Sequence, residues 1–226
     1  MGAYGIAYER HRIDRITRDI TVRGLPRALD GLRVGMITDV HHSAVVSADD
    51  VQQAVTLLKD AAPDIVVLGG DYVSFFDRTF VAPVSELLAP LADAPQGSFA
   101  VLGNHDDEKD VPTALTSKGF TVLRDQRTQL TIKGERLDIA GIRFWTRGPA
   151  DVAAALKGTS GNTILIAHDP RRLVEGVCAG AGSDDGQAEV GDGAGGVDRV
   201  WRRAAFDGGR AAVPVAGGGH RRNQRV

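Results

Sequence analysis

Three short polar segments of this chain carry side chains of the kinds that bind metals, and each follows a run of apolar residues. They are Asp39-Val40-His41, Gly69-Gly70-Asp71 and Gly103-Asn104-His105-Asp106. An apolar run that ends in such residues is typical of a buried parallel strand that delivers ligands at its carboxyl end. Because the segments recur roughly every 30 residues, we expect the three strand ends to converge on one site.

The residue types in these segments favour particular metals. Asp39 and His41 are two residues apart, so their side chains point to the same side of an extended segment, and an oxygen with an imidazole nitrogen suits manganese, iron or zinc better than calcium. Two glycines before Asp71 let the backbone turn sharply, which brings this carboxylate near two cations that it could bridge. Asn104 offers a neutral oxygen. His168, after a later apolar run, offers a further imidazole.

His105 is the candidate catalytic residue of the third segment. Its neighbour Asp106 is close enough to orient it, and such a pair beside a metal-bound phosphate can protonate the leaving alkoxide. Metal coordination lowers the pKa of water towards neutrality, so a hydroxide held by two cations could attack phosphorus in line. These residues predict a two-metal phosphoesterase, with His42 as a residue at the rim that touches substrate.

Each segment alone also has an ordinary explanation. An isolated Asp-x-His occurs often by chance, Gly-Gly-Asp is usually a turn, and Gly-Asn-His-Asp could be a capped loop. His168 alone could be a hydrogen-bonded histidine at a strand end. The order of all four segments, and their placement at strand ends, is what favours a metal site.

The composition is that of an ordinary globular protein and excludes several classes. The 226 residues are 42% hydrophobic and 25% charged, and the formal net charge of −2 gives no electrostatic reason to expect nucleic acid. One cysteine, Cys178, excludes an internal disulfide. No apolar stretch approaches the roughly 20 residues of a membrane span. Residues 1–12 do not form a signal peptide as they stand. Two tyrosines followed by charges resemble the flank of a membrane anchor, but an ordinary mobile N-terminus is the reading that the sequence favours. We expect a cytoplasmic protein as written, or a membrane-associated or exported one if an anchor is missing.

Alternating strand and helix patterns predict an α/β fold with a largely parallel sheet in the first half of the chain. The predicted strands are 18–23, 32–38, 64–68, 98–102, 120–124, 128–133, 136–142 and 163–167. Predicted helices start near Ser47 or Asp49, with Pro63 at the end of the first, and cover 79–92, 111–118 and 149–157. Lys133-Gly134-Glu135 is the predicted turn between two of the later strands.

The last 51 residues differ in composition from the rest of the chain. Residues 176–226 hold 13 of the 28 glycines and almost no sustained apolar period, so they cannot bury enough surface to offset the entropy of ordering them. We divide the chain into an N-terminal extension with an edge strand (1–29), a main domain (30–175) and a Gly-rich tail (176–226) that is expected to be disordered or frameshifted.

The motifs resemble those of the calcineurin-like metallophosphoesterase family. The matching residues are Asp39 and His41, Gly70-Asp71, Gly103-Asn104-His105-Asp106 and His168. Gly31-Leu32-Arg33, ahead of the first ligand strand, is similar to the bacterial branch of membrane-associated members, which often carry an anchor or export signal. The resemblance implies a four-layer αββα sandwich of two mixed sheets, here with an incomplete C-terminal part.

The resemblance also implies roles for the site residues. Asp39, His41 and Asp71 would hold one divalent cation, and Asp71, Asn104 and His168 a second. His105 would be the catalytic histidine. The branch implies a small-molecule or lipid-linked phosphoester as substrate, such as a UDP-sugar lipid, with peripheral membrane contact.

The final Gly-His-x-His of the family, which gives one histidine to each metal, has no match in this chain. The only later histidine is His220, in Gly219-His220-Arg221-Arg222. We therefore expect a frameshifted or truncated C-terminus, which the gene sequence would test. Two readings follow: a phosphoesterase of uncertain activity, or an impaired remnant that binds one metal or phosphate without turnover.

Overall fold

The computed structural model describes residues 13–22, 24–146, 148–159, 161–169 and 209–216. Its larger sheet contains β1 (Arg15–Val22), β9 (Gly209–Ala216), β2 (Val34–Ile37), β3 (Ile65–Leu68), β4 (Ser98–Ala100) and β5 (Thr121–Val122). The strands lie in the order β1-β9-β2-β3-β4-β5. All neighbours are parallel except β1 and β9.

The second sheet has the order β6-β7-β8. It consists of β6 (Gln126–Ile132), β7 (Glu135–Ile142) and β8 (Thr163–Ala167). Because β6 and β7 are antiparallel and β7 and β8 are parallel, this sheet is mixed. The helices are α2 (Ala48–Asp60), α3 (Val81–Leu88), α4 (Asp110–Ser117) and α5 (Pro149–Leu156), with short 3-10 turns η2 (Arg27–Leu29), η3 (Arg78–Phe80) and η4 (Ala89–Leu91).

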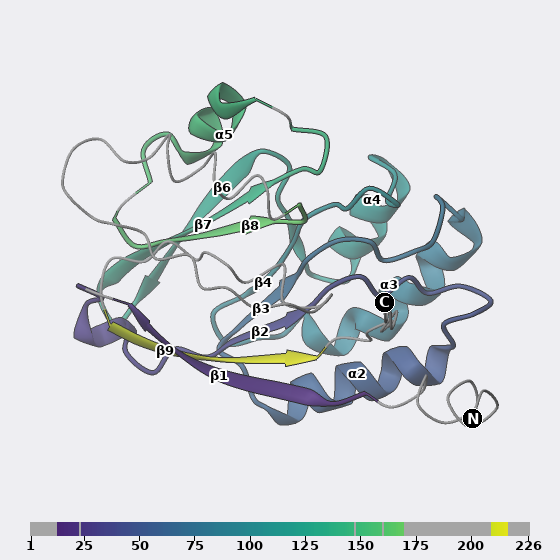
Figure 1. The fold of residues 1–226 in the computed structure, drawn as a ribbon, viewed down its shortest axis with the longest axis horizontal. Helices are drawn as coiled ribbons and strands as arrows, with labels where there is room; N and C mark the ends of the chain where they lie inside the picture. The colour runs from purple at the N-terminus through teal and green to yellow at the C-terminus, as the bar shows by residue number, and fades with distance from the viewer. Residues whose placement is uncertain (1–12, 23, 147, 160, 170–208, 217–226) are drawn as a thin grey trace, which may run out of the picture.

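The two sheets pack face to face, as Figure 1 shows. One buried cluster joins them and includes Met36 and Val67 from the larger sheet and Ile139 and Ile164 from the smaller. Helices α2, α3 and α4 share a second cluster with the other face of the larger sheet, and α5 packs through Val152 on the smaller sheet. Since both faces are covered, β2 and β3 are buried at every residue. The α/β class is confirmed, with one largely parallel sheet and one mixed sheet.

The local patterns placed most elements within three residues of their observed bounds. Ser47 is the N-cap of α2, and its hydroxyl and the Asp50 carboxylate form a reciprocal capping box. The predicted helix over 79–92 is instead α3 between two 3-10 turns. Pro90 lacks the N–H that a continuing helix needs, which explains why α3 ends at Leu88. No helix among the described residues has both the length and the apolar character to span a bilayer.

The tail differs from its prediction at one place. Residues Gly209–Ala216, expected to be unstructured, form β9 between β1 and β2. A strand in this position pairs with both neighbours along its backbone and so leaves neither with an unpaired edge there. The sequence did not predict β9, because the segment has little apolar periodicity. Its pairing with β1 and β2 is made by backbone groups, which leave no such pattern in the side chains. The other tail residues, including His220, lie outside the described residues.

Candidate metal centre

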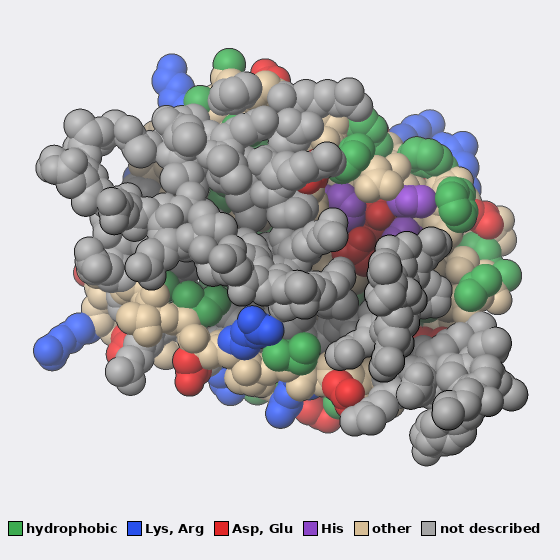
Figure 2. Space-filling model, viewed as in Figure 1, with side chains coloured by type: hydrophobic (Ala, Val, Ile, Leu, Met, Phe, Trp, Pro, Cys, Tyr) green, Lys and Arg blue, Asp and Glu red, His purple; other side chains and the backbone are tan. Residues whose placement is uncertain are grey.

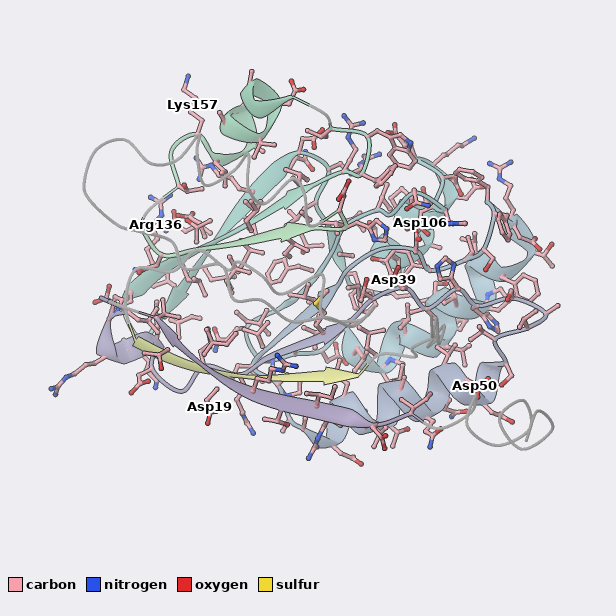
Figure 3. All side chains as sticks on the ribbon, in the orientation of Figure 1. Asp19, Asp39, Asp50, Asp106, Arg136 and Lys157 are labelled. Atoms are coloured by element: carbon pink, nitrogen blue, oxygen red, sulfur yellow. The ribbon has the colours of Figure 1, made fainter. Side chains whose placement is uncertain are left out.

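The three polar segments meet at the carboxyl ends of β2, β3 and β4. Pairing continues beyond the strands, because the Asp39 N–H donates to Gly70 O at 2.9 Å and the His41 N–H donates to Asp71 O at 2.9 Å. Figure 3 shows Asp39 and Asp106 at this end of the sheet. The convergence expected from the spacing of the segments is therefore present.

The backbone is strained at three of the predicted ligands. Asp39, His41 and Asp71 have φ angles of 54°, 49° and 57°, in the left-handed region that residues other than glycine rarely adopt. Such strain persists only where surrounding structure imposes it, and it clusters at functional sites.

Glycines let two of the polar segments approach each other. We call these segments, residues 69–71 and 103–106, the second and third ligand loops. Gly70 has a φ of 97°, and a Cβ atom there would lie 2.5 Å from the Gly103 amide nitrogen. At Gly103, a Cβ would overlap the Asp71 Oδ1 atom and lie 2.5 Å from the Asp71 amide nitrogen. Neither position has room for a side chain.

Gly103→Ala is therefore expected to lower the free energy of unfolding by about 2–3 kcal/mol, as overpacking does in a tight site. Urea denaturation of the metal-free protein measures this. Gly161→Ala is the matched control: its Cβ would meet nothing within 4 Å, so its effect should stay within about 0.5 kcal/mol. Equal stability of the two variants would show that the loops do not need this close approach.

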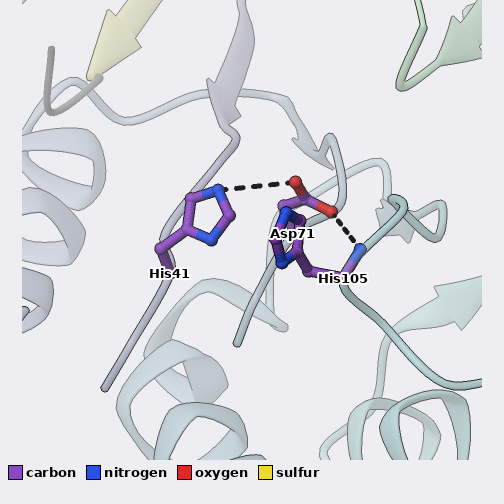
Figure 4. Close-up of side chains that lie close together, drawn as sticks. All are labelled: His41, Asp71 and His105. Atoms are coloured by element: carbon purple, nitrogen blue, oxygen red, sulfur yellow. Dashed lines mark hydrogen bonds and ion pairs between the residues drawn. The ribbon is translucent and has the colours of Figure 1, made fainter. Parts of the chain in front are cut away.

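Asp71 lies at the middle of the site, with 3% of its surface exposed. Its Oδ1 atom accepts the His105 backbone N–H at 2.8 Å. The Oδ2 atom lies 3.4 Å from His41 Nε2 and 3.5 Å from His168 Nε2. Figure 4 shows this carboxylate between His41 and His105. One oxygen is thus tied to the backbone and the other faces two imidazoles.

His168 is held so that one ring nitrogen faces the site. Its Nδ1 atom is 2.9 Å from Gly69 O, and because a carbonyl only accepts, Nδ1 carries the proton. Nε2 then presents a lone pair to Asn104 Oδ1 at 3.1 Å and to Asp71 Oδ2. Acceptor atoms that face one another with no proton between them suit a cation, and a backbone bond to the other nitrogen is the usual support of a ligating histidine.

Two groups of side chains could each hold a metal ion. His41, Asp71 and His105 form one, and Asp39, Asp71 and His168 form the other; within each group the ligand atoms lie within 4.8 Å of one another. Asp71 belongs to both, as expected for a bridging carboxylate. The structure places Asp39 with His168, whereas the family resemblance paired it with His41.

The contact that orients His105 comes from Phe75. The Phe75 backbone N–H donates to His105 Nδ1 at 2.9 Å, so Nδ1 is an acceptor and the proton of the neutral ring is on Nε2. The Phe75 ring also lies edge-on to the His105 ring at 5.0 Å. Sequence reasoning missed Phe75, since no motif marks it. An exposed aromatic pair between a strand and a helix was the one available signal.

Asp106 does not take the orienting role that was predicted for it. It is fully buried, and its carboxylate accepts backbone N–H groups from Asp71 at 2.8 Å, Tyr72 at 2.9 Å and Gly103 at 2.8 Å. Burial raises its pKa to about 6, although the hydrogen bonds from Gly103 and Tyr72 act in the opposite direction. Asp106 therefore connects the second and third ligand loops by hydrogen bonds to the backbone of both.

His42 is not a rim residue in this structure. Only 5% of it is exposed, its Nδ1 atom lies 2.9 Å from Val46 O, and its ring lies edge-on to Phe80 at 5.0 Å. Position next to His41 suggested substrate contact, but the ring of His42 is buried against Phe80 instead of facing the site. The contacts of His42 stabilise the loop before α2.

A polar network behind the site was also missed. Phe144 lies edge-on to His168 at 5.9 Å, and next to it Arg143 bridges Asp125 at 2.7 Å and Glu108 at 2.9 Å. Burial raises the pKa of Asp125, but hydrogen bonds from Thr146 and Arg143 outweigh it and leave the pKa lowered. The network connects the third ligand loop to the segment that supports His168.

Comparison with known proteins adds independent information. The family model of calcineurin-like phosphoesterases matches residues 32–190. The chain is 28% identical over 179 residues to the uncharacterized metallophosphoesterase YkuE of Bacillus subtilis, covering 75% of this chain and 62% of that protein. It is 30% identical over 144 residues to phosphodiesterase YaeI of Escherichia coli, covering 61% and 53%.

A vertebrate relative is similar over a comparable region. The chain is 29% identical over 189 residues to a transmembrane protein with a metallophosphoesterase domain from Danio rerio, covering 75% of this chain and 42% of that protein. The chain thus spans between 42% and 62% of the length of these three relatives. All the ligand candidates lie within the residues that the family model matches.

Proposed function

Because the chain belongs to the calcineurin-like phosphoesterase family, hydrolases that act on phosphoric ester bonds, we propose that it hydrolyses phosphate esters at the centre around Asp71. The observation that carries the proposal is the position of Asp71 between His41 on one side and Asp39 and His168 on the other. Membership of the family also supports the four-layer αββα sandwich expected from the sequence, in which helices cover the outer faces of the two packed sheets.

The proposed cofactors are two divalent cations, with manganese, iron and zinc as the candidates that suit mixed oxygen and imidazole ligands. Asp71 would contact both, and Asp39, His41, Asn104 and His168 would complete the protein's share. When bound, such cations neutralise phosphate charge and activate a water molecule. Support for this assignment comes from the facing acceptor atoms of His168, Asn104 and Asp71.

His105 is the proposed proton donor. Since its Nδ1 atom accepts the Phe75 N–H, its Nε2–H group is available to an oxygen of the phosphate or of the leaving group. His105→Asn should lower turnover by about 100-fold or more and leave both cations bound, whereas His41→Asn should lose one cation. Metal analysis of each variant after gel filtration separates these outcomes. Loss of a cation from His105→Asn would identify His105 as a ligand instead.

Phosphodiesters are the proposed substrate class, because the E. coli relative is a phosphodiesterase. The resemblance to the membrane-associated branch extends the proposal to lipid-linked phosphates. Peripheral membrane contact is proposed on the same ground, and the transmembrane relative from Danio rerio is consistent with it.

Hydrolysis of bis-p-nitrophenyl phosphate and p-nitrophenyl phosphate by the Mn²⁺-loaded protein tests the proposal. We expect turnover of the diester that stops on chelation and returns with Mn²⁺. The second candidate, an impaired remnant, is favoured by the single histidine that follows His168 in the chain. It predicts at most one bound cation and no turnover of either ester.

A further inference from the structure

Two neighbouring aromatic side chains, Phe75 and Phe76, are exposed beside the metal centre. Their exposed fractions are 82% and 53%, and they lie between β3 and η3. Figure 2 shows apolar side chains next to the His and Asp side chains that gather on this face. Rings exposed to this extent add little to the core. An exposed apolar patch that adjoins a candidate site indicates a binding surface.

The backbone at this pair is strained. Phe75 and Phe76 have φ angles of 53° and 59°, a region in which bulky residues are rare and in which glycine or asparagine would be favoured. His105 holds the strained segment through two acceptors, its ring nitrogen Nδ1 and its backbone carbonyl. The Phe75 N–H donates to His105 Nδ1 at 2.9 Å, and the Phe76 N–H donates to His105 O at 3.1 Å. Glycine or asparagine would adopt this backbone with less strain, so the turn does not require phenyl rings at these positions.

The rings lie next to the proposed reaction centre. The Phe75 ring is 5.0 Å from the His105 ring, which is 4.8 Å from the His41 ring. A phosphate bound at Asp71 would therefore have an apolar surface within reach of the group esterified to it. We propose that Phe75 and Phe76 form an apolar platform that binds a hydrocarbon ester group, so that this chain prefers phosphoesters with an extended apolar substituent.

The contact with His105 favours a substrate group over a membrane surface as the occupant. A bilayer would meet the outermost atoms of the patch, whereas Phe75 shares one edge contact and one hydrogen bond with the residue proposed to donate the proton. This inference rests on the proposed phosphoesterase function, and its test includes a measurement that needs no turnover.

The test uses p-nitrophenyl alkyl phosphates from methyl to hexyl, which share one leaving group, with the Mn²⁺-loaded protein. A fully buried methylene would raise kcat/KM about fourfold. An open platform that covers one side of the alkyl chain should raise kcat/KM about twofold per methylene, or about 30-fold from methyl to hexyl. Calorimetric titration with methylphosphonate and hexylphosphonate should show the same trend in Kd without any reaction.

The variants Phe75→Asn and Phe76→Asn remove the rings without adding backbone strain, since asparagine tolerates the left-handed region. Each should reduce the dependence on chain length, in kcat/KM and in Kd. Ile16→Ala is the matched control, because Ile16 is an exposed apolar residue, 46% accessible, on the edge strand β1, which β9 separates from β2 and its ligand segment. Its dependence on chain length should equal that of the unchanged protein.

The outcomes separate the two proposals. If no ester is hydrolysed but hexylphosphonate binds more tightly than methylphosphonate through Phe75 and Phe76, the platform stands and the proposed activity fails. Hydrolysis with no dependence on chain length overturns the platform and leaves the activity intact. Binding to phosphatidylcholine vesicles that requires the two rings, without preference for the hexyl ester, would assign the patch to a membrane and also overturn the inference.

Discussion

Asp71→Asn is expected to release both cations at once and to lower the turnover of bis-p-nitrophenyl phosphate by more than about 100-fold. Its carboxylate belongs to both ligand groups, and even changes outside the coordination shell cost about 10–100-fold. The substitution keeps an oxygen for the His105 N–H, and asparagine tolerates the φ of 57° at this position. The fold should therefore survive while the centre does not.

Metal content per chain, measured after dialysis, distinguishes a shared ligand from an ordinary one. His168→Asn removes a residue of one group only and should lose one cation. Asp93 is an exposed carboxylate away from the site, so Asp93→Asn should keep two cations and remain as active as the unchanged protein. If Asp71→Asn retains one tightly bound cation, Asp71 does not bridge.

Asp106→Asn is expected to destabilise the metal-free protein by roughly 3 kcal/mol. The carboxylate accepts three backbone N–H groups with its two oxygens, whereas an amide has one oxygen and one donor group. At least one buried N–H would face the new NH₂ group and lose its partner, and a lost hydrogen bond to a charged group costs about 1.5–3 kcal/mol. Urea denaturation near neutral pH, above the pKa of about 6, measures the difference.

The neighbouring residue supplies the control for this change. Asp107 accepts the Lys109 N–H at 2.8 Å and the Asp110 N–H through the same atom, Oδ1. Because its Oδ2 atom has no hydrogen-bond partner in the described part of the chain, the single oxygen of asparagine can keep both bonds. Asp107→Asn should therefore stay within about 0.5 kcal/mol of the unchanged protein. An Asp106→Asn variant as stable as Asp107→Asn would show that the buried carboxylate does not join the two loops.

Much of the fold could be predicted from local patterns alone. β2 and β3 are short, fully buried and directly followed by a polar segment, so one apolar run marks both the strand and its end. The ligand candidates were found for the same reason, because carboxyl ends of neighbouring parallel strands share one edge of the sheet. Asp71 stood out further through the two glycines that precede it.

The contacts behind the ligands could not be predicted in this way. Asp106 and His105 are adjacent in the chain, which suggested a pair, but the Asp106 carboxylate turns towards the backbone of Asp71, Tyr72 and Gly103. The bond from Phe75 to His105 joins residues 30 positions apart, and no spacing rule specifies it. Tertiary contacts of this kind depend on how loops pack.

β9 illustrates the other limit. Residues Gly209–Ala216 have a composition that predicts no structure, yet their backbone pairs with β1 over its whole length. Two register positions, Met36 with Val215 and Ile37 with Ala216, connect the strand to β2. Pairing between strands this far apart in the chain depends on the open edges that the two other strands offer. The pattern of apolar residues within the segment therefore does not predict it.

The number of Mn²⁺ ions that the chain binds tests the central claim most directly. Equilibrium titration of the metal-free protein, followed by metal analysis, should give two ions per chain for the unchanged protein and none for Asp71→Asn at the same free Mn²⁺ concentration. One ion per chain, or binding that does not depend on Asp71, would contradict a dinuclear centre around this carboxylate.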